Sequence, residues 1–127
     1  MKILSISIFA IVLFCVSCGS KSNVKEVSVN DAKIAVTEQK AQFIDVRTAS
    51  EFSSEHAENA TSCPLDSLEK DIAKLDKSKP VYVICQSGRR SIDGAKKLQD
   101  AGFKEVYSVA GGTNDWKSKG LPLTKDK

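Results

Sequence analysis

Residues 80–91 read PVYVICQSGRRS, a continuous apolar run followed at once by a polar loop that contains a glycine. The apolar run is rich in β-branched residues and lacks polar alternation, which is typical of a strand buried on both faces of a parallel sheet. A helix pattern follows over residues 91–101, and Gly102 is suited to end it. We therefore predict a strand over 80–85 that enters a helix through the loop beginning at Cys85.

Strand and helix patterns alternate along the rest of the chain. Asn30 and Asp31 supply cap chemistry before one helix pattern, and Thr48 with Glu51 forms a capping box before another. Further strands are expected at residues 27–29, 42–46, 61–64 and 105–109, and further helices at 32–36, 48–54, 66–75 and 113–119. This alternation predicts an α/β domain with a mainly parallel central sheet of about five strands flanked by helices. Ligand sites in such sheets lie beyond the carboxyl ends of the strands, where Cys85 falls.

The loop after Cys85 has the chemistry of an activated nucleophile. A cysteine at the N-terminus of a helix lies among unpaired N–H groups and in the positive end of the helix dipole, and both favour the thiolate. Arg89 and Arg90 add positive charge, and Gly88 allows the backbone to curl so that successive N–H groups converge. The alternatives are an inert buried cysteine at the end of a core strand and, for Arg89, a solvated surface charge.

These residues resemble a known family. The pattern Cys85-x-x-Gly88-x-Arg90-Ser91 resembles the active loop of rhodanese domains. The resemblance covers roughly residues 27–122 through further motifs in the same order: Asp45-Val46-Arg47, Glu51-Phe52, Gly102-Phe103, Gly111-Gly112, Trp116 and Gly120-Leu121-Pro122. It implies a rhodanese-like three-layer fold over residues 27–124 and sulfurtransferase activity without a cofactor or a metal.

The resemblance also implies a mechanism. Cys85 would accept sulfur from thiosulfate or a persulfide donor and pass it from a persulfide to a thiol or to cyanide. Backbone N–H groups from Gln86 through Ser87 to Arg90 would hold the anion, and Arg90 would neutralise the donor or brace the loop. Phosphatases and arsenate reductases on similar folds place five residues between cysteine and arginine, whereas four separate Cys85 from Arg90. The shorter loop favours sulfur over phosphate.

Other residues have predicted supporting roles. Asp45 and Arg47 lie at the end of a strand near the loop. They are expected either to form a buried ion pair that braces the loop or to contact the substrate directly. Ser91 is the last residue of the loop motif. The resemblance gives His56 a structural role in supporting nearby backbone. Cys63 is interpreted as a packing residue, with a resolving thiol as the alternative.

The N-terminal segment has a different character from the domain. Lys2 precedes an apolar run too short to span a bilayer comfortably, which is typical of a signal peptide. Small residues around Cys18 resemble a bacterial lipobox, although Cys15 departs from its usual leucine. We expect residues 1–18 to be a lipoprotein signal peptide ending at a lipidated Cys18, and 19–26 a polar tether. The protein would then be lipid-anchored to the bacterial cell envelope, in the periplasm or at the outer membrane; a cleaved signal or an uncleaved anchor are the alternatives.

Composition limits the other function classes. The net charge of +3 is dispersed and aromatic residues form only 6% of the chain, which argues against a nucleic-acid partner. The domain contains no cysteine and histidine cluster with metal-ligand spacing. Two further hypotheses remain, a non-catalytic docking or regulatory module and a thiol-redox protein that uses Cys63 and Cys85. The intact Cys85 loop argues against a docking module, and the absence of a C-x-x-C motif from the domain argues against a thiol-redox protein.

Overall fold

The computed structural model describes residues 23–126, which form a five-stranded sheet whose strands are all parallel. In sheet order the strands are β1 (Lys25–Val27), β6 (Val106–Val109), β5 (Val81–Ile84), β2 (Gln42–Asp45) and β4 (Thr61–Ser62). The prediction of a mainly parallel sheet of about five strands is confirmed. All five strands end at the same edge, where the loops that carry the candidate site are found.

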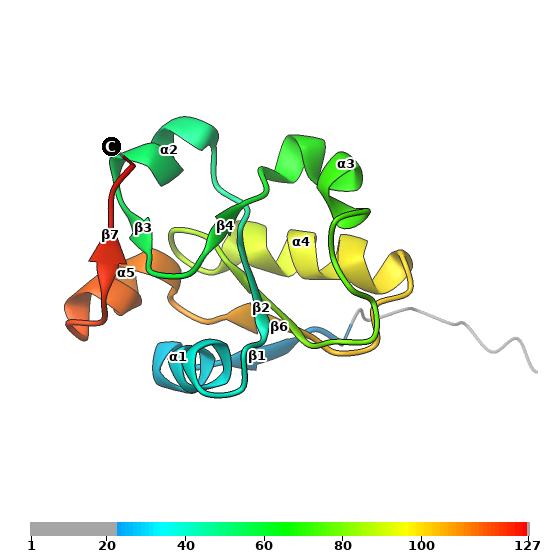
Figure 1. Ribbon diagram of the computed structural model, residues 1–127, viewed down its shortest axis with the longest axis horizontal. Coiled ribbons are helices and arrows are strands. Elements are labelled where there is room, and N and C mark those ends of the chain that lie inside the picture. The colour runs from blue at the N-terminus through cyan, green and yellow to red at the C-terminus, as the bar shows by residue number, and fades with distance from the viewer. Residues whose placement is uncertain (1–22, 127) are drawn as a thin grey trace, which may run out of the picture.

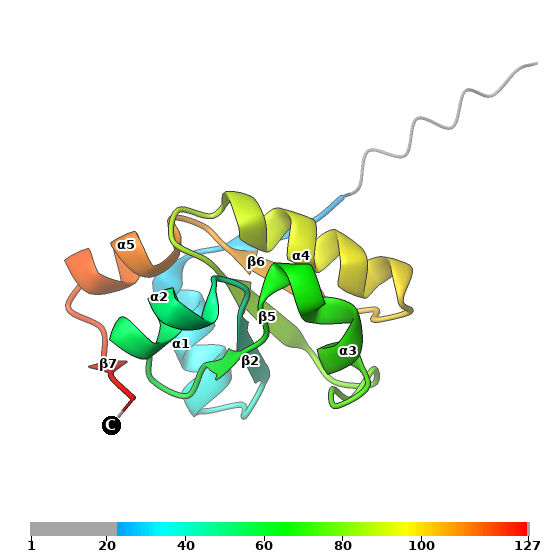
Figure 2. The same cartoon turned by 90° about the horizontal axis from the view of Figure 1, so that it is seen from above.

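Helices cover both faces of this sheet and complete the three-layer arrangement. The helix α4 (Arg89–Asp100) lies on one side and α1 (Val29–Thr37) on the other (Figure 1). Figure 2 shows α3 (Leu68–Ile72) beside α4, and α3 follows the 3₁₀ turn at Leu65–Ser67. The remaining helices are α2 (Ala49–Ser54) and α5 (Gly112–Ser118), and α5 packs against α1.

The central strand β5 is buried on both faces, as its unbroken apolar sequence predicts. Val81, Val83 and Cys85 face the core cluster under α3 and α4. Ile84 lies in the second cluster, which α1 and α5 cover, and the side chains of Val81, Val83 and Ile84 are fully buried. Because neighbouring residues of a strand point to opposite faces, a strand covered on both sides has no polar positions.

Several predicted boundaries are wrong. The cap of α1 is Ser28, whose hydroxyl accepts the N–H of Asp31 at 3.1 Å, so this helix starts before the predicted Asn30–Asp31 cap. The first strand begins at Lys25, so the last two residues assigned to the polar tether belong to the sheet. Likewise α4 begins two residues earlier than predicted and α3 is shorter. The capping box between Thr48 and Glu51 is confirmed.

A second sheet of two short antiparallel strands was not predicted. It pairs β3 (His56–Ala57) with β7 (Leu123–Thr124), and Trp116 Nε1 donates to the carbonyl of Pro122 at 2.8 Å. As a result α2, β3, β7 and α5 gather at one end of the molecule (Figure 1).

The predicted signal peptide with Cys18 lies outside the described residues. Within residues 23–126, no helix has the length and apolar character needed to cross a membrane.

Candidate active site

Cys85 lies at the carboxyl end of β5, where the chain turns into α4. Its side chain is buried, with 1% of the residue exposed. The N–H of Gly88 donates to Sγ at 3.1 Å, and the hydroxyl oxygen of Ser91 lies 3.5 Å from the same sulfur. The loop therefore curls around the thiol, as predicted from its sequence.

This curl depends on two glycines. Gly88 is the N-cap of α4 and has a φ of +98°, in the left-handed region that favours glycine. Gly112 allows α5 to approach the loop, because a Cβ at this position would collide with the backbone of Cys85 and Gln86. The close approach lets Thr113 donate its N–H to the carbonyl of Cys85 at 2.8 Å.

Hydrogen bonds favour the thiolate of Cys85. Burial raises the pKa of this thiol, but the Ser91 hydroxyl and the N–H groups of Ser91, Gly88 and Ser87 lower it by more. The pKa of Cys85 consequently lies below its ordinary value. The charges of Arg89 and Arg90 were expected to contribute to this effect, but in the structure N–H and O–H donors produce it.

A buried hydroxyl behind the site was not predicted. Ser108 on β6 is fully buried, and its Oγ lies 2.7 Å from the Oγ of Ser91. If Ser108 donates to Ser91, the Ser91 proton is free to donate to the sulfur of Cys85. The parallel register brings Ser108 to the site by placing it opposite Val83, two residues before Cys85.

Arg90 binds α2. Its two terminal nitrogens donate to the two carboxylate oxygens of Glu51 at 2.8 and 3.0 Å. The Arg90 guanidinium lowers the pKa of Glu51 to about 2. Of the two predicted roles for Arg90, bracing the loop agrees with this geometry. Arg89 is exposed, and no ion pair within residues 23–126 involves it.

Asp45 and Arg47 form a buried ion pair at 2.7 Å. Arg47 also donates from Nη2 to the backbone carbonyl of Glu55 at 2.8 Å, which ties the end of β2 to the end of α2. His56 supports this region as predicted, because its Nδ1 lies 2.8 Å from the carbonyl oxygen of Phe52.

Cys63 differs from Cys85 in its surroundings. Both thiols are buried and free, but Cys63 lies in the core between β4 and the turn before α3. Burial first, and then the negative charge of Asp71, raise the pKa of Cys63 to about 11. The packing role predicted for Cys63 agrees with these surroundings.

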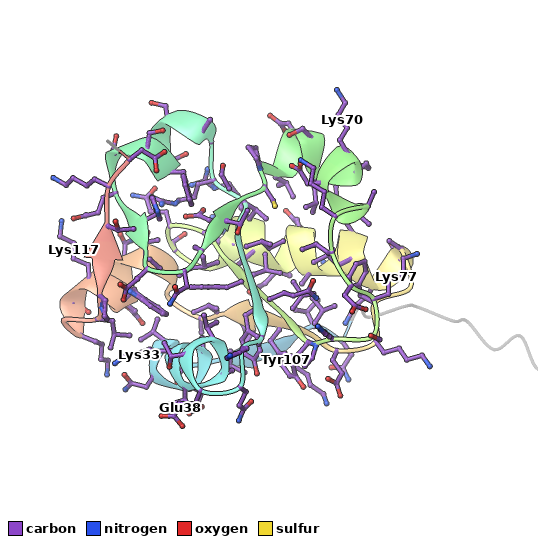
Figure 3. The ribbon with its side chains drawn as sticks, in the orientation of Figure 1. Lys33, Glu38, Lys70, Lys77, Tyr107 and Lys117 are labelled. Atoms are coloured by element: carbon purple, nitrogen blue, oxygen red, sulfur yellow. The ribbon has the colours of Figure 1, made fainter. Side chains whose placement is uncertain are left out.

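A cavity of about 330 Å³ opens beside the loop, between α2 and α5. Its lining residues are mostly polar: Arg47, Glu51, Ser54, Glu55, Gln86, Thr113, Asn114, Lys117 and Leu123. Lys117 projects from α5 at this end of the molecule (Figure 3). The cavity therefore lies close to Cys85, because its wall contains both Gln86, the next residue in the chain, and Thr113, which donates to the Cys85 carbonyl.

A parallel α/β domain that holds a buried cysteine at its carboxyl edge, with backbone N–H groups directed at the sulfur, has the geometry of a cysteine-nucleophile site. Comparison with known families makes the assignment specific, because the family model described as Rhodanese-like domain matches residues 28–119. The chain belongs to this family.

Similar proteins include two curated bacterial relatives. The thiosulfate sulfurtransferase GlpE of Coxiella burnetii is 37% identical over 94 residues, which cover 74% of this chain and 88% of the relative. The putative sulfur carrier protein YrkF of Bacillus subtilis is 33% identical over 104 residues, which cover 81% of this chain and only 56% of YrkF.

The fold also matches solved structures. The crystal structure of a rhodanese-like domain protein from Staphylococcus aureus has a TM-score of 0.72 and 27% identity. The match covers 82% of this chain and the whole of that chain. The rhodanese-like α/β fold predicted from the loop motif is thus confirmed.

Proposed function

We propose that the protein is a sulfurtransferase that carries sulfane sulfur on Cys85. The observation that supports this most directly is the Gly88 N–H at 3.1 Å from Sγ, in a loop whose donors lower the pKa of the thiol. The GlpE relatives, named thiosulfate sulfurtransferases, support the same chemistry.

The reaction has two halves. In the first, the Cys85 thiolate attacks the outer sulfur of thiosulfate, the sulfur–sulfur bond of the donor breaks, and sulfite leaves with the bonding electrons. A persulfide donor would react in the same way and release a thiolate. In the second half, an acceptor thiolate attacks the outer sulfur of the Cys85 persulfide and releases the Cys85 thiolate. Pre-oriented N–H groups of the loop stabilise the negative charge throughout, without a separate base.

Neither alternative function has a supporting observation. A redox role for Cys63 is opposed by its burial and by a pKa of about 11, because the thiolate is the reactive form. A pure docking module would not need N–H donors aimed at a thiol.

The test is the intact mass of the full-length protein, purified in mild detergent, reduced and then treated with thiosulfate. We expect a gain of one sulfur atom that cyanide removes. The Cys85→Ser variant should not gain it, whereas Cys63→Ser, the matched control, should. A reduced wild-type protein that gains no sulfur from thiosulfate or from a persulfide donor would refute the proposal.

We also propose that Cys18 carries a lipid that anchors the protein in the bacterial cell envelope. The apolar run before Cys18 and the small residues around it support this. Radiolabelled palmitate should be incorporated into the wild type and not into Cys18→Ser, with Cys63→Ser, a cysteine of the domain, as the control. Equal labelling of wild type and Cys18→Ser would contradict the proposal.

A further inference from the structure

No step of the proposed transfer of sulfur to Cys85 has so far used the cavity between α2 and α5, yet Gln86, the residue after Cys85, lies in its wall. Two of its lining residues hydrogen-bond the backbone at the start of the loop: the N–H of Thr113 donates to the carbonyl of Cys85 at 2.8 Å, and that of Asn114 to the carbonyl of Gln86 at 3.1 Å. Leu123, which pairs with Ala57 of β3, also lies in the cavity wall. A molecule bound here would lie beside the loop that carries the sulfur.

The lining selects for a polar occupant. Leu123 is its one large apolar residue, and the charged residues have both signs. Arg47 is already paired with the buried Asp45 at 2.7 Å, and Glu51 is held by both terminal nitrogens of Arg90. Each of these two charges is already neutralised by a partner within the protein.

The pair formed by Lys117 and Glu55 is different. Lys117 Nζ lies 3.2 Å from Glu55 Oε2, and these side chains are 68% and 35% exposed. They come from α5 and from the end of α2, so they face each other from opposite walls of the cavity. An exposed ion pair contributes little free energy, so a ligand that replaces its contacts can open it.

We propose that this cavity is the acceptor site, and that it binds a small thiol bearing an α-amino-acid head group. Such a head group carries one carboxylate and one ammonium on the same carbon atom, so that its carboxylate meets Lys117 while its ammonium meets Glu55. The four charges then alternate in sign. A thiol with one charge leaves one member of the pair unmatched. The volume of about 330 Å³ lies in the range of small-molecule sites.

This inference rests on the proposed persulfide of Cys85, because the bound thiol has to reach its outer sulfur. The thiolate of the acceptor attacks that sulfur, a new sulfur–sulfur bond forms, and the bond to Cys85 breaks. The Cys85 thiolate departs with the electron pair, and the acceptor leaves as a persulfide. No oxidant or reductant is needed.

The experiment uses full-length protein in mild detergent, loaded with sulfur by thiosulfate, with the loaded fraction measured by intact mass before each reaction. Discharge is then followed with three thiols that share one cysteine thiol: γ-glutamylcysteine, glutarylcysteine, which lacks the α-ammonium, and 4-aminobutanoylcysteine, which lacks the α-carboxylate. We expect γ-glutamylcysteine to discharge the loaded enzyme about three- to fivefold faster than either analogue, from the free energy typical of exposed ion pairs.

The variants assign the effect to the two side chains. Lys117→Ala should abolish the advantage over 4-aminobutanoylcysteine, and Glu55→Gln the advantage over glutarylcysteine. Lys119→Ala, an exposed lysine one residue beyond α5 and outside the cavity, should keep both advantages.

Equal discharge rates for the three thiols on loaded wild-type enzyme would overturn the acceptor site and favour a protein thiol as the acceptor. An equal loss in Lys117→Ala and Lys119→Ala would also overturn it, because general surface charge would then be the cause. A failure to load Cys85 would instead refute the proposed function itself, so the two failures are distinguishable.

Discussion

The pair of buried hydroxyls behind Cys85 leads to a prediction about its reactivity. Ser91 Oγ lies 3.5 Å from the sulfur, and Ser108 Oγ lies 2.7 Å from Ser91 Oγ. With Ser108 as a donor, the Ser91 hydroxyl is oriented towards the thiolate. Removing either hydroxyl should therefore raise the pKa of Cys85, and Ser91→Ala should do so by more than Ser108→Ala.

The size of the effect follows from the contacts. A hydrogen bond to a charged group contributes about 1.5–3 kcal/mol, and about 1.4 kcal/mol corresponds to one pKa unit. The contact of Ser91 with sulfur is long and the N–H of Gly88 remains, so the lower end applies to Ser91→Ala, a rise of about one unit. Ser108→Ala leaves the Ser91 hydroxyl in place but free to rotate, and should raise the pKa by roughly half as much.

The assay is the pH dependence of alkylation by iodoacetamide, with the peptide that contains Cys85 quantified by mass spectrometry so that the other cysteines do not contribute. Below the pKa, a rise of one unit lowers the thiolate fraction about tenfold. Ser118→Ala, an exposed serine on α5, is the control and should titrate as the wild type. An unchanged pKa in Ser91→Ala, or a larger shift in Ser108→Ala than in Ser91→Ala, would refute the proposed chain of donors.

Three further predictions concern the loop. Gly88→Ala should lower the free energy of unfolding in urea by about 1–2 kcal/mol, the cost of a left-handed non-glycine residue, and should prevent sulfur loading, whereas normal loading would show that the curl is dispensable. The folded-state pKa of Glu51 is lowered from 4.5 to about 2, so its pair with Arg90 stabilises the fold above pH 4.5, and this stabilisation is lost as the pH falls towards 2. The melting temperature of the wild type should therefore fall over this pH range by more than that of Glu51→Gln, which lacks the titrating carboxylate; equal falls would contradict the prediction. Arg89→Gln should raise the KM for thiosulfate about three- to fivefold at low salt while leaving the KM for an uncharged persulfide donor unchanged, and equal effects on both donors would contradict a charge-based role.

The sequence was sufficient for the features that depend on local pattern. The apolar run of β5 predicts a strand buried on both faces, and Gly88 predicts the turn of the loop, because each property belongs to a few consecutive residues. The ion pair of Asp45 with Arg47 joins residues two positions apart, so it too could be expected from the chain alone.

The missed features join distant positions. Ser108 meets Ser91 across 17 residues, and Arg90 meets Glu51 across 39. The first contact depends on the register between β5 and β6, and the second on where α2 packs, neither of which a single-sequence pattern determines. The β3–β7 sheet was missed for a related reason: two-residue strands carry no periodicity, and they form only when the end of the chain folds back beside α2.

The ion pairs around the loop determine which groups stabilise the thiolate of Cys85. Arg47 and Arg90 are each neutralised by a carboxylate, at 2.7 and 2.8 Å, so the thiolate of Cys85 is stabilised mainly by N–H and O–H dipoles at short range. Buried dipoles are little affected by salt, whereas exposed charges more than a Debye length apart are screened. It follows that the reactivity of Cys85 should be insensitive to ionic strength, while capture of an anionic donor through the exposed Arg89 should weaken as salt is added. Different groups would then stabilise the Cys85 thiolate and attract an anionic donor. This explains how a site in which Arg47 and Arg90 are paired can favour a thiolate through the Ser91 hydroxyl and the backbone N–H groups.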